Sequence, residues 1–400
     1  MKKRPLPKKE ADLCTRCATC TAVCPVSRVT PQFPGPKQAG PGVERRNGLD
    51  PLARDDWMDL CIGCRLCNVA CPSGVDIYEL NLLKRTAGRG RQRRVMRDWL
   101  LSHAYLFGMA GSRLSRLVNP FLKNLLFKRI LDVIMGVDQK SKLPSYEPQP
   151  FEKWFSTRHL RSDRRVAYFY GCYTNTNETE VGKAVVRILE KVGIETVLPF
   201  QTCCGIPMLG ACDIDGARKA GLKNVPALLK AVRSGLEIVF SSSSCGLMIR
   251  HEYSRLLSIP GAEEVAAHTH DFFEYLRGLV GSGGIELTLK ALPVKAAYFA
   301  PCHLKSLGIG LPALNILRMI PGIEICNLET NCCGLGGAYG FKKEKASISV
   351  DIGEDLAGEI SEVKPDFVIS DCEGCRLQIR RLTGLKVVHP VQVLADALCN

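Results

Sequence analysis

The second half of the chain alternates between short apolar runs and longer stretches with helical periodicity. The expected strands are β-branched or aromatic runs at 165–170, 195–198, 237–240, 294–299, 323–326 and 366–369. The expected helices carry apolar residues at three- and four-residue spacing over 180–192, 217–233, 312–320 and 346–363. Such alternation of strands and helices predicts parallel sheets covered by helices.

A different pattern precedes these elements. From Leu114 to Ile134, apolar residues recur at helical spacing, which predicts an amphipathic helix that Pro120 kinks or restarts. The basic residues between them are Arg113, Arg116, Lys123, Lys128 and Arg129. The following segment, 142–150, contains three prolines and is expected to be an extended linker. The amphipathic stretch either packs on a neighbouring domain or binds a membrane surface or a subunit.

Composition excludes several classes of protein. The 400 residues are 46% hydrophobic and 24% charged, as in a globular protein of two or three domains, and neither disorder nor a small disulfide scaffold fits. No apolar run approaches the roughly 20 residues of a membrane-spanning helix. Residues 1–13 are basic and polar, so we expect no signal peptide. The 20 cysteines should therefore be reduced, as metal ligands or redox groups.

The charge is concentrated in one part of the chain. Residues 1–165 hold 31 Lys and Arg against 15 Asp and Glu, a net charge of +16. Residues 166–400 hold the remaining 23 against 25, a net charge of −2. The basic part predicts an anionic partner, which could be a phospholipid surface, an acidic subunit or a nucleic acid.

Eight cysteines form two equal runs, Cys14-x2-Cys17-x2-Cys20-x3-Cys24-Pro25 and Cys61-x2-Cys64-x2-Cys67-x3-Cys71-Pro72. Each is the bacterial ferredoxin run for a [4Fe–4S] cluster, and zinc or unliganded thiols fit it much less well. In two-cluster ferredoxins the fourth cysteine of a run serves the other cluster. We therefore predict one cluster on Cys14, Cys17, Cys20 and Cys71. The second is predicted on Cys61, Cys64, Cys67 and Cys24. Two such clusters relay single electrons.

The later cysteines mark an internal duplication. Each copy has a leading cysteine, then a Cys-Cys-Gly motif after 30 or 29 intervening residues, then a cysteine that opens a helix. The first copy contains Cys172, Cys203, Cys204 and Cys245. The second copy contains Cys302, Cys332, Cys333, Cys372 and Cys375. Two similar units predict two similar domains that face each other.

The two copies differ in ligand number. Adjacent cysteines diverge and can bridge neighbouring irons, so the five thiols of the second copy favour an iron–sulfur cluster over zinc. In the first copy Ser242 stands where the second has Cys372. Its four thiols suit a [4Fe–4S] cluster or zinc, or the site is degenerate, structural or substrate-facing. The other cysteines, expected to be packing residues, are Cys212, Cys326 and Cys399.

Two weaker signals lie beside the second copy. The glycine-rich loop 334–340 lacks the G-x-G-x-x-G spacing, so we expect close backbone approach to a cluster rather than a nucleotide site. His303 directly follows Cys302. It is either a hydrogen-bonded strand-end residue or a proton donor beside a reduced cluster.

The combination of motifs resembles the iron–sulfur subunits of flavin-linked respiratory dehydrogenases, with similar subunits in glycolate oxidase and heterodisulfide reductase. In detail the chain is more similar to the iron–sulfur C subunits of anaerobic glycerol-3-phosphate dehydrogenases. The resemblance spans about 14–399. The segments that carry it are Cys24-Pro-Val-Ser-Arg-Val29, 34–41, 101–103, Pro301-Cys-His303 and Cys332-Cys-Gly334 with the run to Glu344.

We expect an α+β multidomain fold: a helical two-cluster ferredoxin domain followed by two duplicated α/β cysteine-rich domains. The expected boundaries are 1–94 for the ferredoxin-like domain, 95–164 for the basic amphipathic region and linker, and 165–290 and 291–400 for the cysteine-rich domains.

The resemblance also implies partners. It implies an FAD-containing subunit that oxidises sn-glycerol 3-phosphate to dihydroxyacetone phosphate, a second accessory subunit, and no nucleic acid. This chain would pass electrons to menaquinone and attach the complex peripherally to the cytoplasmic face of the inner membrane. The alternatives are a subunit of a glycolate or lactate oxidase, or a heterodisulfide-reductase-like subunit that reduces a disulfide at the second-copy cluster.

Overall fold

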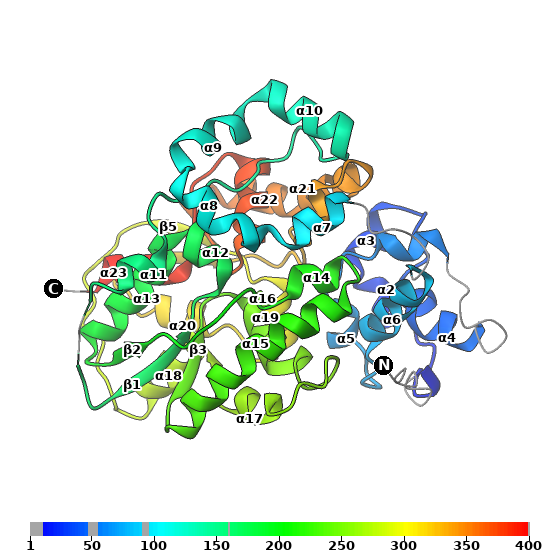
Figure 1. Ribbon diagram of the computed structural model, residues 1–400. Coiled ribbons are helices and arrows are strands. Elements are labelled where there is room, and N and C mark those ends of the chain that lie inside the picture. Colours follow the sequence, from blue (N-terminus) through cyan, green and yellow to red (C-terminus); the bar gives the residue numbers. More distant parts are fainter. Residues whose placement is uncertain (1–10, 47–54, 90–95, 159–160, 399–400) are drawn as a thin grey trace.

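The computed structural model describes residues 11–46, 55–89, 96–158 and 161–398 (Figure 1). The N-terminal ferredoxin-like domain lies at one side of the molecule, and its described residues form helices and turns without a strand. Its elements are α2 (Thr19–Ala22), α3 (Pro25–Val29), π-helical η1 (Gln38–Gly42), α4 (Val43–Arg46), 3-10 helical η2 (Asp56–Leu60), α5 (Leu66–Val69) and α6 (Ile77–Arg89). The expected helical character of this domain is confirmed.

The expected amphipathic helix is two helices, α9 (Ser115–Lys123) and α10 (Leu125–Met135). Pro120 lies inside α9 and does not end it. The break falls instead at Asn124, whose extended backbone and side-chain oxygen, accepting from the Phe127 N–H, begin α10. We call residues 114–135 the arm, which projects from the body in Figure 1. The elements on either side of it are α7 (Met96–Ser102), η3 (Ala104–Phe107), α8 (Gly108–Arg113) and α11 (Phe151–Phe155).

The duplicated part contains two four-stranded parallel sheets with the same strand order. The first sheet has the order β2-β1-β3-β4 and the second β6-β5-β7-β8. The first set of strands is β1 (Arg165–Phe169), β2 (Glu195–Val197), β3 (Glu237–Phe240) and β4 (Thr269–Asp271). The second set is β5 (Lys295–Tyr298), β6 (Glu324–Asn327), β7 (Phe367–Ile369) and β8 (Val387–Val388). The predicted duplication and parallel sheets are confirmed, whereas β4 and β8 were not predicted.

The helices of the two copies also correspond. The first copy has α12 (Gly171–Thr176), α13 (Thr179–Lys191), α14 (Ile206–Gly210), α15 (Ile214–Arg233), α16 (Ser243–Leu247), π-helical η4 (Met248–Glu252), α17 (Ala262–Ala267) and α18 (Phe272–Gly281). The second has α19 (Cys302–Leu307), α20 (Pro312–Leu317), 3-10 helical η5 (Tyr339–Phe341) and η6 (Lys343–Lys345), α21 (Ala346–Val363), α22 (Glu373–Thr383) and α23 (Pro390–Ala397).

One apolar core joins the two copies. It contains buried residues of both, including Leu189 of α13, Phe272 of α18, Leu317 of α20 and Leu394 of α23. Helix α13 of the first copy packs against α23 of the second. The two cysteine-rich domains therefore face each other across a shared interior, and their strand ends are held in fixed positions.

The ferredoxin-like domain contacts both copies. Arg65 forms an ion pair of 2.7 Å with Glu252 of the first copy, and the two side chains are only 7% and 4% exposed. Arg28 of α3 pairs with Asp355 of α21 in the second copy. Both contacts lie beside the ferredoxin cysteine runs, so they set where the ferredoxin sites stand relative to the repeated domains.

Candidate iron–sulfur centres

The two ferredoxin runs share an unusual backbone. Counted from the first cysteine, the third and fifth residues of each run have positive φ: Arg16 (63°) and Ala18 (66°) in the first, Gly63 (79°) and Arg65 (61°) in the second. Three of these four residues are not glycine, and such conformations are uncommon for side-chain-bearing residues. The same outlier at the same place in both runs indicates that the runs adopt one functional geometry, a loop that curls around a ligand.

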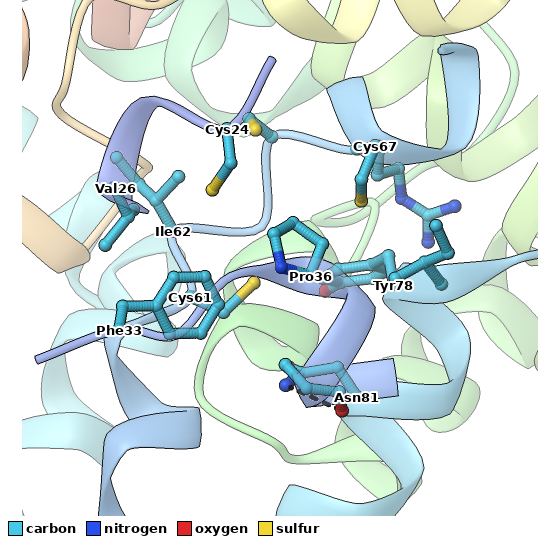
Figure 2. Close-up of a pocket in the computed structure, with 13 residues that line it drawn as sticks. Cys24, Val26, Phe33, Pro36, Cys61, Ile62, Cys67, Tyr78 and Asn81 are labelled. Carbon is cyan, nitrogen blue, oxygen red and sulfur yellow. Dashed lines mark hydrogen bonds between the residues drawn. The ribbon is translucent and has the colours of Figure 1, made fainter. Parts of the chain in front are cut away.

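The first three cysteines of the second run, Cys61, Cys64 and Cys67, line one apolar pocket together with Cys24 (Figure 2). Burial raises the pKa of Cys67, and the nearby charges of Cys61 and Cys24 raise it further, so these thiols lie close together. The remaining walls are mainly apolar and include Val26, Phe33, Pro36, Ala39, Ile62, Ile77 and Tyr78. A pocket with four convergent thiols and mainly apolar walls fits a [4Fe–4S] cluster.

The other four ferredoxin cysteines form a second group. Burial raises the pKa of Cys20, and the charges of Cys14, Cys71 and Cys17 add to that rise. Cys14 and Cys71 pack on a small apolar cluster that contains Val75. Each fourth cysteine thus lies with the first three of the other run, which is the crossed grouping that the spacing predicts.

The five thiols of the second copy also meet in space. A hydrogen bond to Cys332 raises the pKa of Cys302, and hydrogen bonds to Cys333 and Cys372 raise that of Cys375. Gly334 directs its backbone N–H at Cys332 Sγ, 3.5 Å away, with a φ of +86°. A Cβ at Gly334 would lie 2.1 Å from the Ser349 carbonyl oxygen of α21. The glycine after the cysteine pair is therefore required for both turn and packing.

The first copy repeats this arrangement with four thiols. A hydrogen bond to Cys203 raises the pKa of Cys172, and Cys204 is hydrogen-bonded to Cys245. The Gly205 N–H again points at the first thiol of the pair, with 3.5 Å between the nitrogen and Cys203 Sγ.

Ser242 and Cys372 occupy equivalent positions, as the N-caps of α16 and α22. The Ser242 hydroxyl donates to Glu373, with 3.0 Å between Oγ and Oε2, and so contacts the other copy. Ser244 Oγ also lies 3.9 Å from Cys372 Sγ. Residues that flank the two thiol sets therefore meet across the domain interface.

The ferredoxin sites adjoin the second copy. Burial makes the largest contribution to the raised pKa of Cys64, and the nearby charge of Cys332 makes the next largest. The charge of Cys64 likewise raises the pKa of Cys302. Because Cys64 belongs to the pocket of Figure 2, the pocket's thiols and the second-copy thiols are neighbours. The second ferredoxin site and the second-copy site therefore lie next to each other.

Within the ranges that the structure describes, no group of three His, Cys, Asp or Glu side chains is arranged to hold one metal ion. Cysteine ligands of a cluster surround several irons and need not converge on a single point. Sets of four and five cysteine thiols are donors that iron–sulfur clusters take. When bound, such a cluster supplies one-electron chemistry.

His303 lies where three domains meet. Its Nδ1 is 3.0 Å from Ser244 Oγ, and its Nε2 is 3.4 Å from the Gly63 carbonyl oxygen. Burial, with the charge of Arg65, lowers the pKa of His303 to about 4, which favours a neutral ring. These contacts and the neutral ring match a hydrogen-bonded strand-end residue more closely than they match a proton donor. The role of His303 in proton transfer stays a prediction.

The glycine-rich loop 334–340 packs closely against other parts of the chain. Besides Gly334 against α21, a Cβ at Gly336 would lie 2.2 Å from the Ile62 side chain of the ferredoxin-like domain. The loop therefore lies at the contact between the second copy and the ferredoxin-like domain. Of the remaining cysteines, Cys212 is buried in an apolar core, Cys326 is half-buried in β6, and Cys399 lies outside the described residues.

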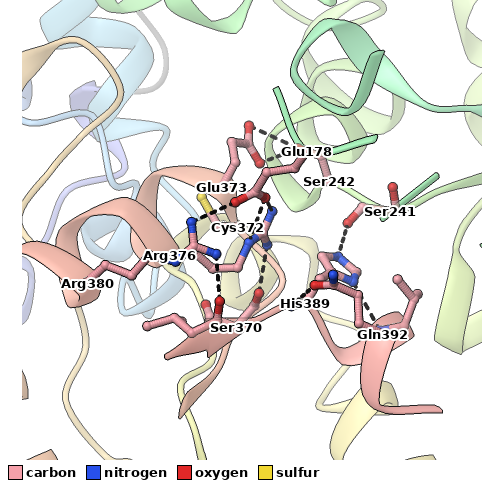
Figure 3. A network of polar contacts seen from close by, with 12 residues as sticks. Glu178, Ser241, Ser242, Ser370, Cys372, Glu373, Arg376, Arg380, His389 and Gln392 are labelled. Atoms are coloured by element: carbon pink, nitrogen blue, oxygen red, sulfur yellow. Dashed lines mark hydrogen bonds and ion pairs between the residues drawn. The ribbon is translucent and has the colours of Figure 1, made fainter. Parts of the chain in front are cut away.

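A buried polar network near these sites was not predicted (Figure 3). Arg376 of α22 donates to Glu178 and to the Ser370 carbonyl oxygen, and Arg380 donates to Glu178. Isolated charged residues carry no sequence signal of burial, so only the structure could reveal that Glu178 of the first copy binds α22 of the second.

Family models match three parts of the chain. Residues 10–75 match the 4Fe-4S dicluster domain, so two [4Fe–4S] clusters are its cofactors. Residues 166–250 and 296–380 each match the cysteine-rich domain. No helix among the described residues is long and apolar enough to cross a membrane.

Several curated proteins are similar. The C subunit of the anaerobic glycerol-3-phosphate dehydrogenase of Escherichia coli K12 is 36% identical over 96% of this chain and 98% of its own length. The D subunit of a heterodisulfide reductase of Methanosarcina acetivorans is 24% identical over 92% and 88%. Lactate utilization protein A of Geobacillus thermodenitrificans is 31% identical over 58% and 98%.

One solved structure supports the fold. A hypothetical protein from Helicobacter pylori covers 99% of this chain and 74% of its own, with a TM-score of 0.51 and 12% identity. This likeness concerns the fold alone. The sequence match across nearly the whole of both chains, together with the three domain matches, shows that this chain belongs to the family of the iron–sulfur C subunit of anaerobic glycerol-3-phosphate dehydrogenase.

Proposed function

We propose that the chain is the electron-transfer subunit of an anaerobic glycerol-3-phosphate dehydrogenase complex. An FAD-containing subunit would supply electrons from sn-glycerol 3-phosphate, a second accessory subunit would complete the complex, and quinone would accept the electrons. The observation that carries the proposal is the closeness of Cys64 to Cys332 and Cys302, because it links the ferredoxin pocket to the cysteine-rich domains. No substrate of the flavoprotein needs to bind this chain.

The proposed ligand sets follow the grouping of the thiols. Cys14, Cys17, Cys20 and Cys71 hold one [4Fe–4S] cluster, and Cys24, Cys61, Cys64 and Cys67 hold the other. A further iron–sulfur cluster is held by Cys302, Cys332, Cys333, Cys372 and Cys375. Cys172, Cys203, Cys204 and Cys245 hold a cluster or zinc.

Anaerobic purification with metal analysis tests this proposal. We expect about 8–12 irons per chain, the content of two or three [4Fe–4S] sets. The clusters should be reduced by the flavoprotein and glycerol 3-phosphate and reoxidised by a quinone. Stoichiometric zinc with almost no iron would reject the proposal. Thiol release from a heterodisulfide, with no quinone reduction, would favour the disulfide-reducing alternative.

A second part of the proposal concerns the membrane. The arm exposes a row of large apolar side chains, among them Leu117 (64%), Leu126 (67%), Val133 (81%) and Ile134 (73%). Basic residues accompany them in the sequence. An exposed apolar face with Lys and Arg beside it binds an anionic lipid surface. We infer that the arm attaches the complex peripherally to the cytoplasmic face of the inner membrane.

Vesicle flotation tests the arm. The double variant Val133→Glu with Ile134→Glu should lose binding to anionic vesicles, because it places two charges on the apolar face. Leu222→Glu on α15 is the matched control, since Leu222 is also exposed, at 41%, but lies outside the arm. Reduction of a soluble dye should be unchanged in both. Retained vesicle binding by the double variant would show that the arm is not the attachment site.

A further inference from the structure

A cavity of about 580 Å³ lies under the arm. Its walls come from α9 and α10 of the arm, from the linker 142–147, from α12 and the start of α13, and from α22 and α23. Its volume lies within the roughly 300–1,000 Å³ that is typical of small-molecule sites. The cavity belongs to neither ferredoxin site, and the ferredoxin-like domain contributes none of its lining residues.

The cavity wall combines apolar surface with nearly balanced charge. The basic lining residues are Lys123, Lys128, Lys142 and Arg380, and the acidic ones are Glu147, Glu178 and Glu180. Several cations are already engaged: Lys128 Nζ donates to the Ser141 carbonyl oxygen and Lys142 Nζ to that of Arg380, each at 2.8 Å. The apolar surface comes from Leu122, Leu143, Leu377 and the ring of Tyr173. Such a wall suits a neutral ring compound with polar oxygens better than an anion.

Two helices bring the thiol sets to this cavity. Tyr173 lines the cavity and directly follows Cys172 in α12. Leu377 lines it from α22, two residues after Cys375. A helix rises about 1.5 Å per residue, so each lining residue lies within one turn of a proposed ligand. Side chains one and two residues apart leave a helix in different directions, so each helix stands between the cavity and its thiol, and a ligand would lie about one helix diameter, roughly 10 Å, from each thiol set.

The polar network of Figure 3 forms part of the same wall. Glu178 and Arg380 line the cavity, and Arg376 ties Glu178 to α22. Gln392 lines it from α23 and accepts from the His389 backbone N–H. These contacts fix the polar groups of the inner wall, as a site that orients a ligand requires.

The outer wall belongs to the arm. Leu122 and Lys123 of α9 line the cavity, whereas the adjacent Phe121 is 61% exposed on the arm's surface. The proposed lipid-binding element is thus also one wall of the cavity. A lipid-borne ligand would meet the cavity directly beneath the surface that holds the arm on the membrane.

We propose that this cavity is the quinone-binding site, an inference that rests on the electron-transfer function proposed above. Two electrons from the flavoprotein arrive singly through the clusters, and two protons come from water at the open side of the cavity. The quinone takes up both, forming two O–H bonds, and leaves as quinol.

Filling the cavity tests the inference. Leu122→Trp and Leu143→Trp narrow it from the arm and the linker, away from every proposed ligand. The full chain is reduced anaerobically, and cluster reoxidation by a water-soluble short-chain 1,4-naphthoquinone is followed optically. We expect the quinone concentration at half-maximal rate to rise about tenfold or more. Leu222→Trp, an exposed leucine on α15, should behave like the unchanged chain.

Three readouts separate the outcomes. Iron content and reoxidation by ferricyanide should match the unchanged chain, which shows that the variants fold and keep their clusters. If the unchanged chain shows no saturable reoxidation by quinone, the proposed quinone reduction fails. If it does, and both tryptophan variants match it within twofold, the cavity is not the quinone site. A quinone carrying a photoreactive azide should label peptides from 119–147, 173–180 or 377–392, and labelling only elsewhere would also overturn the assignment.

Discussion

The two cysteine-rich domains share a strand order and a thiol arrangement, yet they differ at the ends of equivalent strands. After β3 and β7 the N-cap of the next helix is Ser242 in the first copy and Cys372 in the second. The serine binds Glu373 of the other copy. The first copy therefore lacks one thiol and has a hydrogen bond to its partner domain in its place. The two copies share a scaffold, while this strand end carries a thiol in one copy and a contact between the copies in the other.

Two further pairs of positions show the same divergence. Ser241 accepts or donates a 2.7 Å hydrogen bond with the Tyr168 hydroxyl, and Asp371 accepts one of 2.7 Å from Tyr298. After β4 and β8, the N-caps of α18 and α23 are Asp271 and His389, and both form capping boxes. His389 Nε2 donates to the Ser241 carbonyl oxygen. The strand ends of the two copies thus complement each other across the interface.

The largest expected effect comes from removing a thiol of the cysteine pair. Cys332→Ala should abolish electron transfer from the ferredoxin pocket, because Cys332 lies nearest to Cys64, and should remove roughly four irons per chain. Cys203→Ala in the first copy should leave reoxidation of the ferredoxin sites by quinone intact. Iron analysis and electron paramagnetic resonance measure both. Equal loss of ferredoxin-site reoxidation by quinone in the two variants would contradict the proposed order of the sites.

The contacts of the ferredoxin-like domain with the two copies offer a second contrast. Glu252→Ala leaves Arg65 charged, buried and unpaired, which should lower the free energy of unfolding by about 3–5 kcal/mol. Asp355→Ala removes the partner of Arg28, but these side chains are 47% and 53% exposed, so the loss should be at most about 1 kcal/mol. Anaerobic urea denaturation measures both. Similar losses would show that burial does not distinguish the two interfaces.

Much of this organisation could be predicted from the sequence, because cysteines and apolar residues recur in it at regular spacing. The cysteine runs predicted which thiols gather, and four- and five-residue strands such as β1 and β5 left an apolar signal. Strand β4 (Thr269–Asp271) contains no apolar residue and β8 is only two residues long, so neither leaves an apolar signal in the sequence. Contacts such as Arg65 with Glu252 join residues far apart in the chain, and no local pattern encodes them. The break at Asn124 was missed because the apolar spacing continues across it, and the proline four residues earlier was expected to mark the break instead.

A third contrast concerns pH. Burial, together with the charge of Asp371, raises the pKa of Asp271 to about 8 and outweighs its helix-capping hydrogen bonds. Between about pH 4 and pH 8 the unfolded chain has therefore lost a proton that the folded chain retains. Stability should fall as pH rises through this window, by at most about 1.4 kcal/mol per pH unit.

Urea denaturation at several pH values checks this slope. Asp271→Asn keeps an oxygen that can cap α18 and should flatten the slope. Asp215→Asn on the exposed side of α15 is the control and should keep it. A slope that persists in Asp271→Asn would assign the pH dependence to other groups.

The smallest expected effect, and the sharpest test of the comparison, lies at the N-cap where the copies differ. Ser242→Ala removes the hydroxyl that caps α16 and donates to Glu373, so stability should fall by about 1 kcal/mol while iron content stays unchanged. Cys372→Ser at the equivalent position should instead release iron from the second copy, because a thiol ligand is lost. Metal analysis beside anaerobic denaturation separates the two effects. If Ser242→Ala also lost iron, the serine would itself be a ligand, and the first copy would have kept five ligands rather than exchanged one for a contact between the domains.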